Sequence, residues 1–222
     1  MLLEKLYKHR FELFFISIIC VLFGSLFFPK ELFANKISPI LFIVNILSGM
    51  LFFIKKRVQI LGASILFAII LGIFLFNTIS NSEDSSIRYL RLITYFTFYS
   101  FVTFQIIRQV WSAQTVNKSV IFGLMSGYIS LGLLGFFTLF CVELAVPGSF
   151  NGILIDSSIA IKIDELLYFS YITIMTIGYG DISPATDIAQ KAVVFVGLSG
   201  QFYLVIITAV VIEKYIRYSA KE

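Results

Sequence analysis

The sequence predicts an all-α membrane protein with six transmembrane helices and one shorter helix that enters the membrane without crossing it. Of its 222 residues, 59% are hydrophobic and 14% are charged, whereas an average soluble domain has about 25% charged residues. Six apolar runs reach the roughly 17 to 25 residues that a helix needs to cross a bilayer. A seventh apolar stretch, between the fifth and sixth runs, is too short to cross.

The six long apolar runs are expected at about 11–28, 38–54, 58–77, 88–108, 119–146 and 190–213. Their order predicts four parts of the chain. The first run is expected to stay in the mature chain, because its apolar core is too long for a signal peptide and no small-residue cleavage site follows. The predicted parts are a four-helix domain at 1–110, an interfacial linker with Trp111 at 111–118, a second domain at 119–216 and a short tail at 217–222.

The basic residues predict the orientation. With the N-terminus in the cytoplasm, most of the 17 lysines and arginines fall in cytoplasmic segments: Lys5, Lys8, Arg10, Lys55, Lys56, Arg57, Arg108, Lys118, Lys214, Arg217 and Lys221. Basic residues are enriched on the cytoplasmic side of membrane proteins, so both termini are expected there. The net charge of +4 comes with no basic run interleaved with aromatics. The expected partner is therefore membrane lipid, and no nucleic acid.

Catalysis is not expected. His9 is the only histidine, and no serine or cysteine is spaced with it as nucleophile and base. Cys20 and Cys141 lie in apolar stretches without metal-ligand spacing, which is typical of free thiols. The sequence thus predicts neither an enzyme nor a bound cofactor.

The short apolar stretch runs from Glu165 to Met175 and reads E-L-L-Y-F-S-Y-I-T-I-M. Ser157, Ser158 and Asp164 precede it and suit a helix start. A short helix that enters from outside would direct the negative end of its dipole toward the bilayer centre, where it attracts cations. The glycines that follow interrupt the helix at this depth. Irregular backbone is tolerated there only when it is buried in protein or lines a water-filled cavity.

The next six residues, T-I-G-Y-G-D at Thr176–Asp181 (the filter segment), resemble the T-V-G-Y-G-D signature of tetrameric potassium channels, with Ile177 in place of valine. Tyr168–Pro184, Y-F-S-Y-I-T-I-M-T-I-G-Y-G-D-I-S-P, is similar to the pore helix, filter and following loop of bacterial members. The resemblance is strong over about 119–215, and the preceding helices agree with the six-helix type in number and order.

The resemblance implies a potassium-selective pore in the plasma membrane. Carbonyl oxygens of the filter would replace the hydration shell of K+, which is the permeant ion rather than a cofactor. They belong to Thr176, with its hydroxyl, Ile177, Gly178 and Tyr179, flanked by Gly180 and Asp181. Because each chain has one filter segment, a ring needs a four-fold symmetric homotetramer. Two alternatives are a non-conducting accessory subunit and a non-selective cation channel, and an intact filter segment disfavours both.

Three residues depart from the family pattern behind the filter segment. Many members have tryptophans where Tyr168 and Phe169 stand, and their indole donors brace the filter. Tyr168 keeps a donor, whereas Phe169 has none. Some members have a glutamate at the position of Ile172. We therefore hypothesise a less braced filter that is prone to slow changes in conductance.

Two further features concern gating. Gly200 occupies the position of a family glycine that bends the inner helix, and a helical glycine marks either a hinge or a close helix contact. The fourth helix resembles the voltage-gated branch at Arg88 and Arg91, but its three-residue register continues with hydroxyl residues at Thr94, Thr97, Ser100 and Thr103. The hydroxyls can equally be small polar residues at a helix contact. We expect a degenerate sensor with weak or no voltage dependence.

Overall fold

The computed structural model describes residues 2–29, 32–55, 57–80, 85–155 and 157–219. The chain divides into two compact units, unit 1 at Met1–Gly127 with Lys214–Glu222, and unit 2 at Tyr128–Glu213. Apart from one pair of two-residue strands, the regular elements of the described residues are helical.

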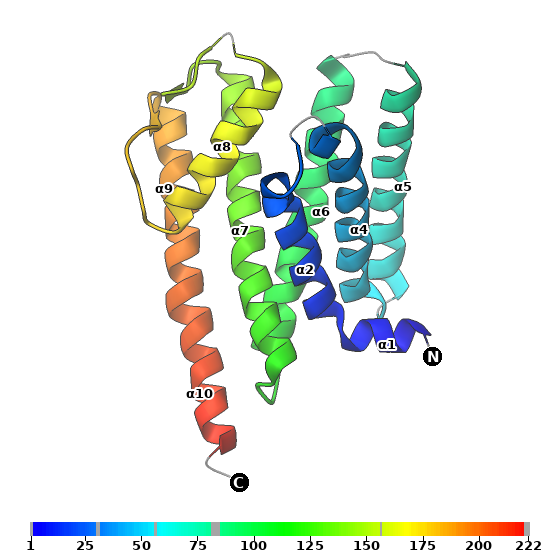
Figure 1. Ribbon diagram of the computed structural model, residues 1–222. Helices are drawn as coiled ribbons and strands as arrows, with labels where there is room; N and C mark the ends of the chain where they lie inside the picture. The colour runs from blue at the N-terminus through cyan, green and yellow to red at the C-terminus, as the bar shows by residue number, and fades with distance from the viewer. Residues whose placement is uncertain (1, 30–31, 56, 81–84, 156, 220–222) are drawn as a thin grey trace. The chain divides into compact units, whose positions relative to one another are not determined.

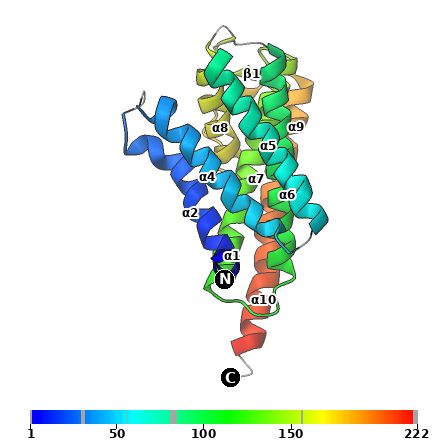
Figure 2. The ribbon, with the colours of Figure 1, turned by 90° about the vertical axis from the view of Figure 1, so that its right-hand side faces the viewer.

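Unit 1 is built from four long helical segments that lie side by side (Figures 1 and 2). Its elements are α1 (Leu2–Lys8), α2 (Arg10–Phe23), the 3-10 turn η1 (Gly24–Leu26), the π-helical turn η2 (Phe33–Ile37), α4 (Ser38–Met50), the 3-10 turn η3 (Leu51–Phe53), α5 (Arg57–Ser80) and α6 (Ser85–Trp111). α7 (Lys118–Ala145) begins in unit 1 and continues into unit 2. The helices lie where the first four apolar runs predict them.

A buried, uncharged polar cluster joins three helices of unit 1. Asn45 on α4 donates to the Ser17 hydroxyl at 2.9 Å and accepts from the Tyr99 hydroxyl at 2.6 Å. The hydroxyls of Ser17 and Ser48 are also 2.9 Å apart. Buried polar groups are stable when they are hydrogen-bonded in this way. The cluster therefore fixes α2, α4 and α6 to one another without a buried charge.

Unit 2 holds the shorter predicted helix between two long ones. It contains β1 (Phe150–Asn151), α8 (Ile159–Ile174), β2 (Ser183–Pro184), α9 (Asp187–Phe202), the π-helical turn η4 (Tyr203–Ile207) and the start of α10 (Thr208–Ser219). β1 pairs with β2 in antiparallel register, Phe150 opposite Pro184. Figure 1 shows α8 beside the upper part of α9.

The caps explain where the helices of unit 2 begin. The Ser158 hydroxyl accepts from the Ile161 amide, so α8 begins before the apolar stretch at Glu165. Ser158 was among the residues predicted to suit the helix start; the apolar stretch itself begins later, because Lys162 and Asp164 interrupt the apolar pattern of the first turns. Thr186 caps α9 through the Ala189 amide. Both caps have the acceptor side chains that helix N-termini favour.

Two helices of the described chain are long and apolar enough to cross a membrane, Lys118–Ala145 and Asp187–Arg217. Two shorter apolar helices lie at Ile40–Phe53 and Gln59–Gly72. Together with the apolar composition, these helices support an all-α membrane protein.

Candidate functional site

The backbone of the filter segment changes hand at every residue. Its φ angle is +58° at Thr176, +57° at Gly178 and +82° at Gly180. Thr176 is the one non-glycine residue with positive φ among the described residues. Glycine adopts this conformation freely, whereas threonine is strained in it. A strained threonine persists only where its surroundings hold it, so the neighbouring contacts matter.

Two amides of the filter segment bond back to the preceding helix. The N–H groups of Ile177 and Gly178 both donate to the Ile172 carbonyl, at 2.8 and 3.3 Å. The described chain has no cis peptide bond, and in a trans peptide the N–H and C=O groups point in opposite directions. The carbonyls of Thr176 and Ile177 therefore point away from Ile172. Two successive oxygens are thus presented on the side of the segment away from α8.

The filter segment is exposed in the single chain, with Ile177 45% and Tyr179 71% accessible. A Cβ added to Gly178 or Gly180 would meet no atom within 4 Å. Glycine is therefore required at these positions by the backbone angle and not by crowding. The filter segment is therefore accessible in the single chain.

Three hydroxyl groups fasten the filter-proximal half of unit 2. Ser170 on α8 donates to the Gly132 carbonyl at 2.6 Å, and Tyr171 donates to the Ile129 carbonyl at 2.8 Å. In the opposite direction, from α7 to α8, the Tyr128 hydroxyl donates to the Ile174 carbonyl at 3.0 Å. Ile174 is the last residue of α8, so this bond holds the helix end from which the filter segment emerges. The roles of these hydroxyl groups were not predicted from the sequence.

Glycines on α7 make this close approach sterically possible. A Cβ on Gly132 would lie 2.3 Å from the Tyr171 ring, and one on Gly135 would lie 2.5 Å from the Ser170 hydroxyl oxygen. The spacing G-L-L-G in an apolar helix was the available sequence signal, since small residues mark close helix packing in membranes.

Gly200 packs against the end of α8. A Cβ at this position would lie 2.4 Å from Ile174 Cγ1 and 2.8 Å from the Ile174 carbonyl oxygen. Of the two alternatives, hinge or close contact, the contact explains the glycine directly. The gating role of Gly200 stays a prediction. Three residues further on, helix geometry does change, at the π-helical turn η4, and such turns are common sites of helix bending.

The outer end of the filter segment has one hydrogen-bonded brace. The Tyr168 hydroxyl donates to Asp181 Oδ2 at 2.8 Å, and this bond raises the pKa of Tyr168. Phe169 is buried and packs edge-on against Phe150 of β1, with ring centroids 5.7 Å apart. Ile172 is buried and serves the filter through its carbonyl rather than its side chain. The phenol thus does bind the aspartate, while Phe169 contributes packing alone.

The loop before α8 supports the loop after the filter segment. The Ala185 amide donates to the Ser149 carbonyl at 2.8 Å, next to the β1–β2 pair. Gly152 has φ +89°, and a Cβ there would lie 2.2 Å from the Asp181 carbonyl oxygen. The backbone at Asp181 therefore rests directly on the backbone at Gly152, which explains why a residue without a side chain is needed.

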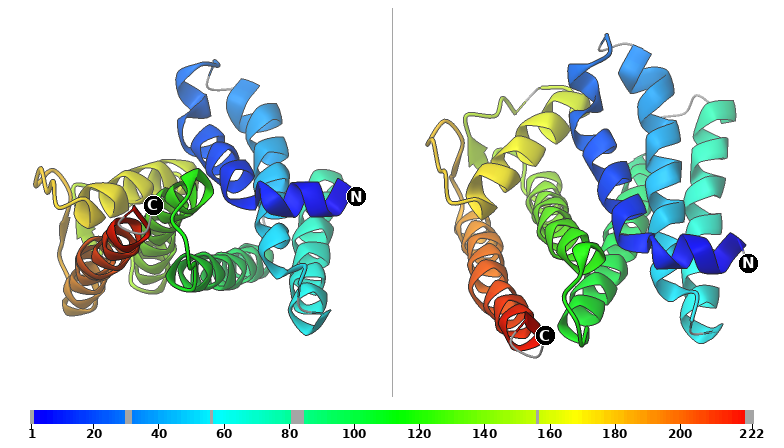
Figure 3. Two further views of the ribbon diagram at one scale, coloured as in Figure 1. Left: turned by 90° about the horizontal axis from the view of Figure 1, so that it is seen from below. Right: turned by 60° about the horizontal axis from the view of Figure 1, so that its bottom comes forward.

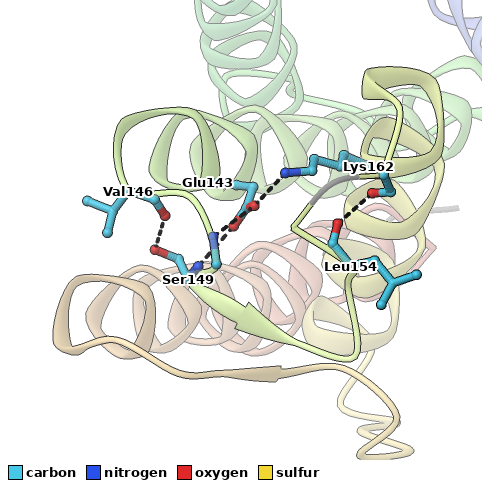
Figure 4. A network of polar contacts seen from close by, with 7 residues as sticks. Glu143, Val146, Ser149, Leu154 and Lys162 are labelled. Carbon is cyan, nitrogen blue, oxygen red and sulfur yellow. Dashed lines mark hydrogen bonds and ion pairs between the residues drawn. The ribbon is translucent and has the colours of Figure 1, made fainter.

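This supporting loop is held by a buried carboxylate on α7 (Figure 4). Glu143 is 2% exposed; its Oε1 accepts from Lys162 Nζ at 3.0 Å and from the Gly148 amide at 3.1 Å. Its Oε2 accepts from the Ser149 amide at 3.0 Å. One carboxylate thus joins α7, the loop at 148–149 and the first turn of α8. This pairing was not predicted from the sequence.

Arg88 and Arg91 lie in the first two turns of α6, and their side chains are outside the part that the structure describes. Further along the same register, the Thr94 and Ser100 hydroxyls donate to the carbonyls of Leu90 and Phe96, four residues earlier. Thr103 is 2% exposed. The hydroxyls at 94 and 100 are therefore satisfied within α6 and need no partner helix.

Of three comparisons with known proteins, one gave a match. Searches of curated proteins and of solved structures gave no match. Residues 148–217 match the model of a family described as ion channel. The match covers β1, α8, the filter segment, α9 and most of α10, which are the elements that form and flank the site. This part of the chain is therefore similar to the ion channel family, which supports a membrane protein that conducts ions passively.

Proposed function

We propose that the protein is a homotetrameric potassium channel with weak or no voltage dependence. The observation that carries the proposal is the backbone of the filter segment. Left-handed residues alternate at Thr176, Gly178 and Gly180, while the intervening amides of Ile177 and Gly178 turn toward Ile172. This arrangement supports a row of carbonyl oxygens on one side of the segment, the ligands that select K+ in rings of four.

The surroundings of the segment favour a cation. α8 ends at Ile174, two residues before Thr176, so the negative end of its dipole lies beside the first carbonyls. Neutral carbonyl oxygens bind a weakly hydrated monovalent ion without holding it as tightly as a carboxylate site would. Asp181 supplies a negative charge at the outer end, where it attracts cations before they enter.

Four copies are needed because each chain contributes one filter segment. On α9 and η4, large apolar side chains are exposed in the single chain: Val194 60%, Phe195 63%, Phe202 60% and Val205 65%. Such a surface is expected against neighbouring copies or lipid. We propose that each chain crosses the plasma membrane six times, with both termini in the cytoplasm and without enzymatic activity.

Unit 1 is proposed to act as a scaffold rather than as a steep voltage sensor. Arg88 and Arg91 are followed in the same register by hydroxyl residues, two of which bond within their own helix. The cluster at Asn45 that joins its helices is uncharged. Each charge moved across the membrane contributes about 2.3 kcal/mol per 100 mV, so two outer arginines per chain would give shallow gating at most.

The test is ion flux in liposomes that contain the purified protein, with K+ and Na+ compared across a range of voltages. We expect K+ flux well above Na+ flux and a shallow dependence on voltage. Gly178→Ala should abolish the selective flux because its φ of +57° strains any side chain. Gly197→Ala is the matched control, since a Cβ there meets no atom within 4 Å. Equal K+ and Na+ flux would indicate a non-selective channel, and no flux would favour an accessory subunit.

A further inference from the structure

A second feature of the chain lies far from the filter segment in sequence, at the turn between α1 and α2. α1 leaves the start of α2 at a steep angle and lies against η3, which follows α4 (Figures 1 and 3). The break falls at His9, where φ is −102° and ψ is +21°. α1 therefore runs across the end of the helices of unit 1 rather than along them.

α1 has one apolar and one charged face. Its sequence is L-L-E-K-L-Y-K, in which Leu3, Leu6 and Tyr7 follow one side of the helix while Lys5 and Lys8 follow the other. Leu3 is 62% exposed and Leu6 is 36% exposed. A helix with exposed apolar side chains and lysines on the opposite face is typical of a segment that lies in the headgroup region of a membrane.

Two cations contact the ring of Tyr7 in the last turn of α1. The Arg10 guanidinium carbon lies 4.2 Å from the centre of the Tyr7 ring, and Lys55 Nζ lies 4.8 Å from the same centre. Within the described part of the chain, neither cation forms an ion pair with a carboxylate. Both cations are attracted to the ring, and an anion beside the ring would interact favourably with each of them.

Arg10 is oriented and keeps donors to spare. Its Nε donates to Gln109 Oε1 at 2.7 Å, and its Nη1 donates to the Tyr7 carbonyl at 2.9 Å. A guanidinium has five N–H donors in a rigid fork that matches phosphate oxygens. Partial burial lowers the pKa of Arg10, while Tyr7 and Glu12 act in the opposite direction. Burial thus disfavours the charged form of Arg10, and a further anion beside the guanidinium would stabilise that form.

The charges nearby favour an anion over a cation. Lys5, Lys8, Arg10 and Lys55 outnumber the carboxylates of Glu4 and Glu12. Glu12 is itself engaged by the Ser119 hydroxyl at 3.1 Å and lies 3.9 Å from His9 Nδ1. Basic clusters at the cytoplasmic ends of transmembrane helices bind anionic lipid headgroups.

We propose that Tyr7, Arg10 and Lys55 form a site for the phosphate of an anionic phospholipid in the inner leaflet, with α1 lying in the headgroup region. The lipid phosphate bridges the guanidinium and the ammonium over the Tyr7 ring. Leu3 and Leu6 then face the acyl chains. This inference rests on the proposed function only for its topology, which sets this end of unit 1 in the cytoplasm.

The test measures lipid binding by the full chain in detergent and needs no ion flux. Native mass spectrometry and thermal unfolding are followed while phosphatidylglycerol, phosphatidylcholine or inorganic phosphate is added. We expect phosphatidylglycerol to bind at least about tenfold more tightly than phosphatidylcholine and to raise Tm, and inorganic phosphate to have little effect. A protein that conducts no ions can still pass this test, so failure of the proposed function is distinguishable.

Variants locate the site. Lys55→Gln should weaken phosphatidylglycerol binding about fivefold, because each basic residue near an anionic surface contributes a comparable increment. Tyr7→Leu should also weaken it, since the ring that gathers both cations is lost. Lys36→Gln is the matched control; Lys36 is an exposed lysine at the opposite end of α4. Equal binding of both lipids, an equal effect of inorganic phosphate, or equal losses in the Lys55 and Lys36 variants would overturn the proposal.

Discussion

Replacing Lys162 with an uncharged residue should lower the free energy of unfolding of unit 2, although Lys162 is not part of the filter segment. Lys162→Met leaves the Glu143 carboxylate buried, with the Gly148 and Ser149 amides as its remaining donors. Breaking a buried ion pair by removing one partner typically costs about 3–5 kcal/mol. The side chains are 10% and 1% exposed, so solvent screens the pair little.

The magnitude can be bounded from the geometry. At the observed 3.0 Å, an effective dielectric constant near 20 gives a gross attraction of about 5–6 kcal/mol between the two charges. Desolvation of both charges offsets most of it. The two amide bonds to the carboxylate remain, and bonds to a charged group contribute about 1.5–3 kcal/mol each. We therefore expect Lys162→Met to cost about 3 kcal/mol, at the lower end of the range.

The double variant separates the charge from the packing. Glu143→Gln with Lys162→Met removes both charges and should be less destabilised than Lys162→Met alone, by about 1–2 kcal/mol. The measurement is chemical unfolding of the full chain in detergent, analysed as a double-mutant cycle. Lys191→Met, which removes an exposed lysine on α9, is the matched control. Additive single effects, or a Lys162→Met variant within about 0.5 kcal/mol of the natural chain, would refute the reasoning.

Three other predictions test the site and the sensor. Tyr168→Phe should make K+ current decline faster during long recordings, because it removes the hydrogen bond to Asp181. Because the pKa of Tyr168 is raised, the phenol should still donate this bond at pH 10 and lose it only as pH rises further. Equally steady currents in the variant and the natural protein would contradict a bracing role for this bond. Gly200→Ala should lower thermal stability through its clash with Ile174, whereas Gly197→Ala should be neutral or stabilising, so equal effects would count against the packing interpretation. Neutralising Arg88 and Arg91 together should leave the conductance–voltage curve nearly unchanged; a large shift would show that they sense voltage.

The positions of the helices and of the filter segment could be predicted from the sequence because each depends on local properties. Apolar length predicts a membrane helix, and paired glycines in T-I-G-Y-G-D predict irregular backbone. α8 begins before the apolar stretch at Glu165, after Ser158, which was one of the predicted helix starts; Lys162 and Asp164 interrupt the apolar pattern of its first turns. There the cap at Ser158, not hydropathy, determines where the helix begins.

Contacts between distant segments could not be predicted in this way. Glu143 and Lys162 are 19 residues apart, and nothing in their local sequence indicates that both are buried. Tyr128 and Ile174 are 46 residues apart, and a tyrosine in an apolar helix is equally consistent with a lipid-facing position. Such pairs depend on the approach of two helices, which the hydropathy of either helix alone does not specify.

The contacts at Ile174 suggest how the strained Thr176 is held. The Ile174 carbonyl accepts from Tyr128, and the Ile174 side chain and carbonyl both pack against Gly200. The Tyr128 ring also lies 5.8 Å from the ring of Tyr203, the first residue of η4. The helix end that carries the filter segment is thus fixed from α7 and from α9 within unit 2. A change of helix angle at η4 would move Tyr203 relative to Tyr128. Because the Tyr128 hydroxyl holds the end of α8, the contact between these two rings links the π-helical turn η4 to the backbone that leads into the filter segment.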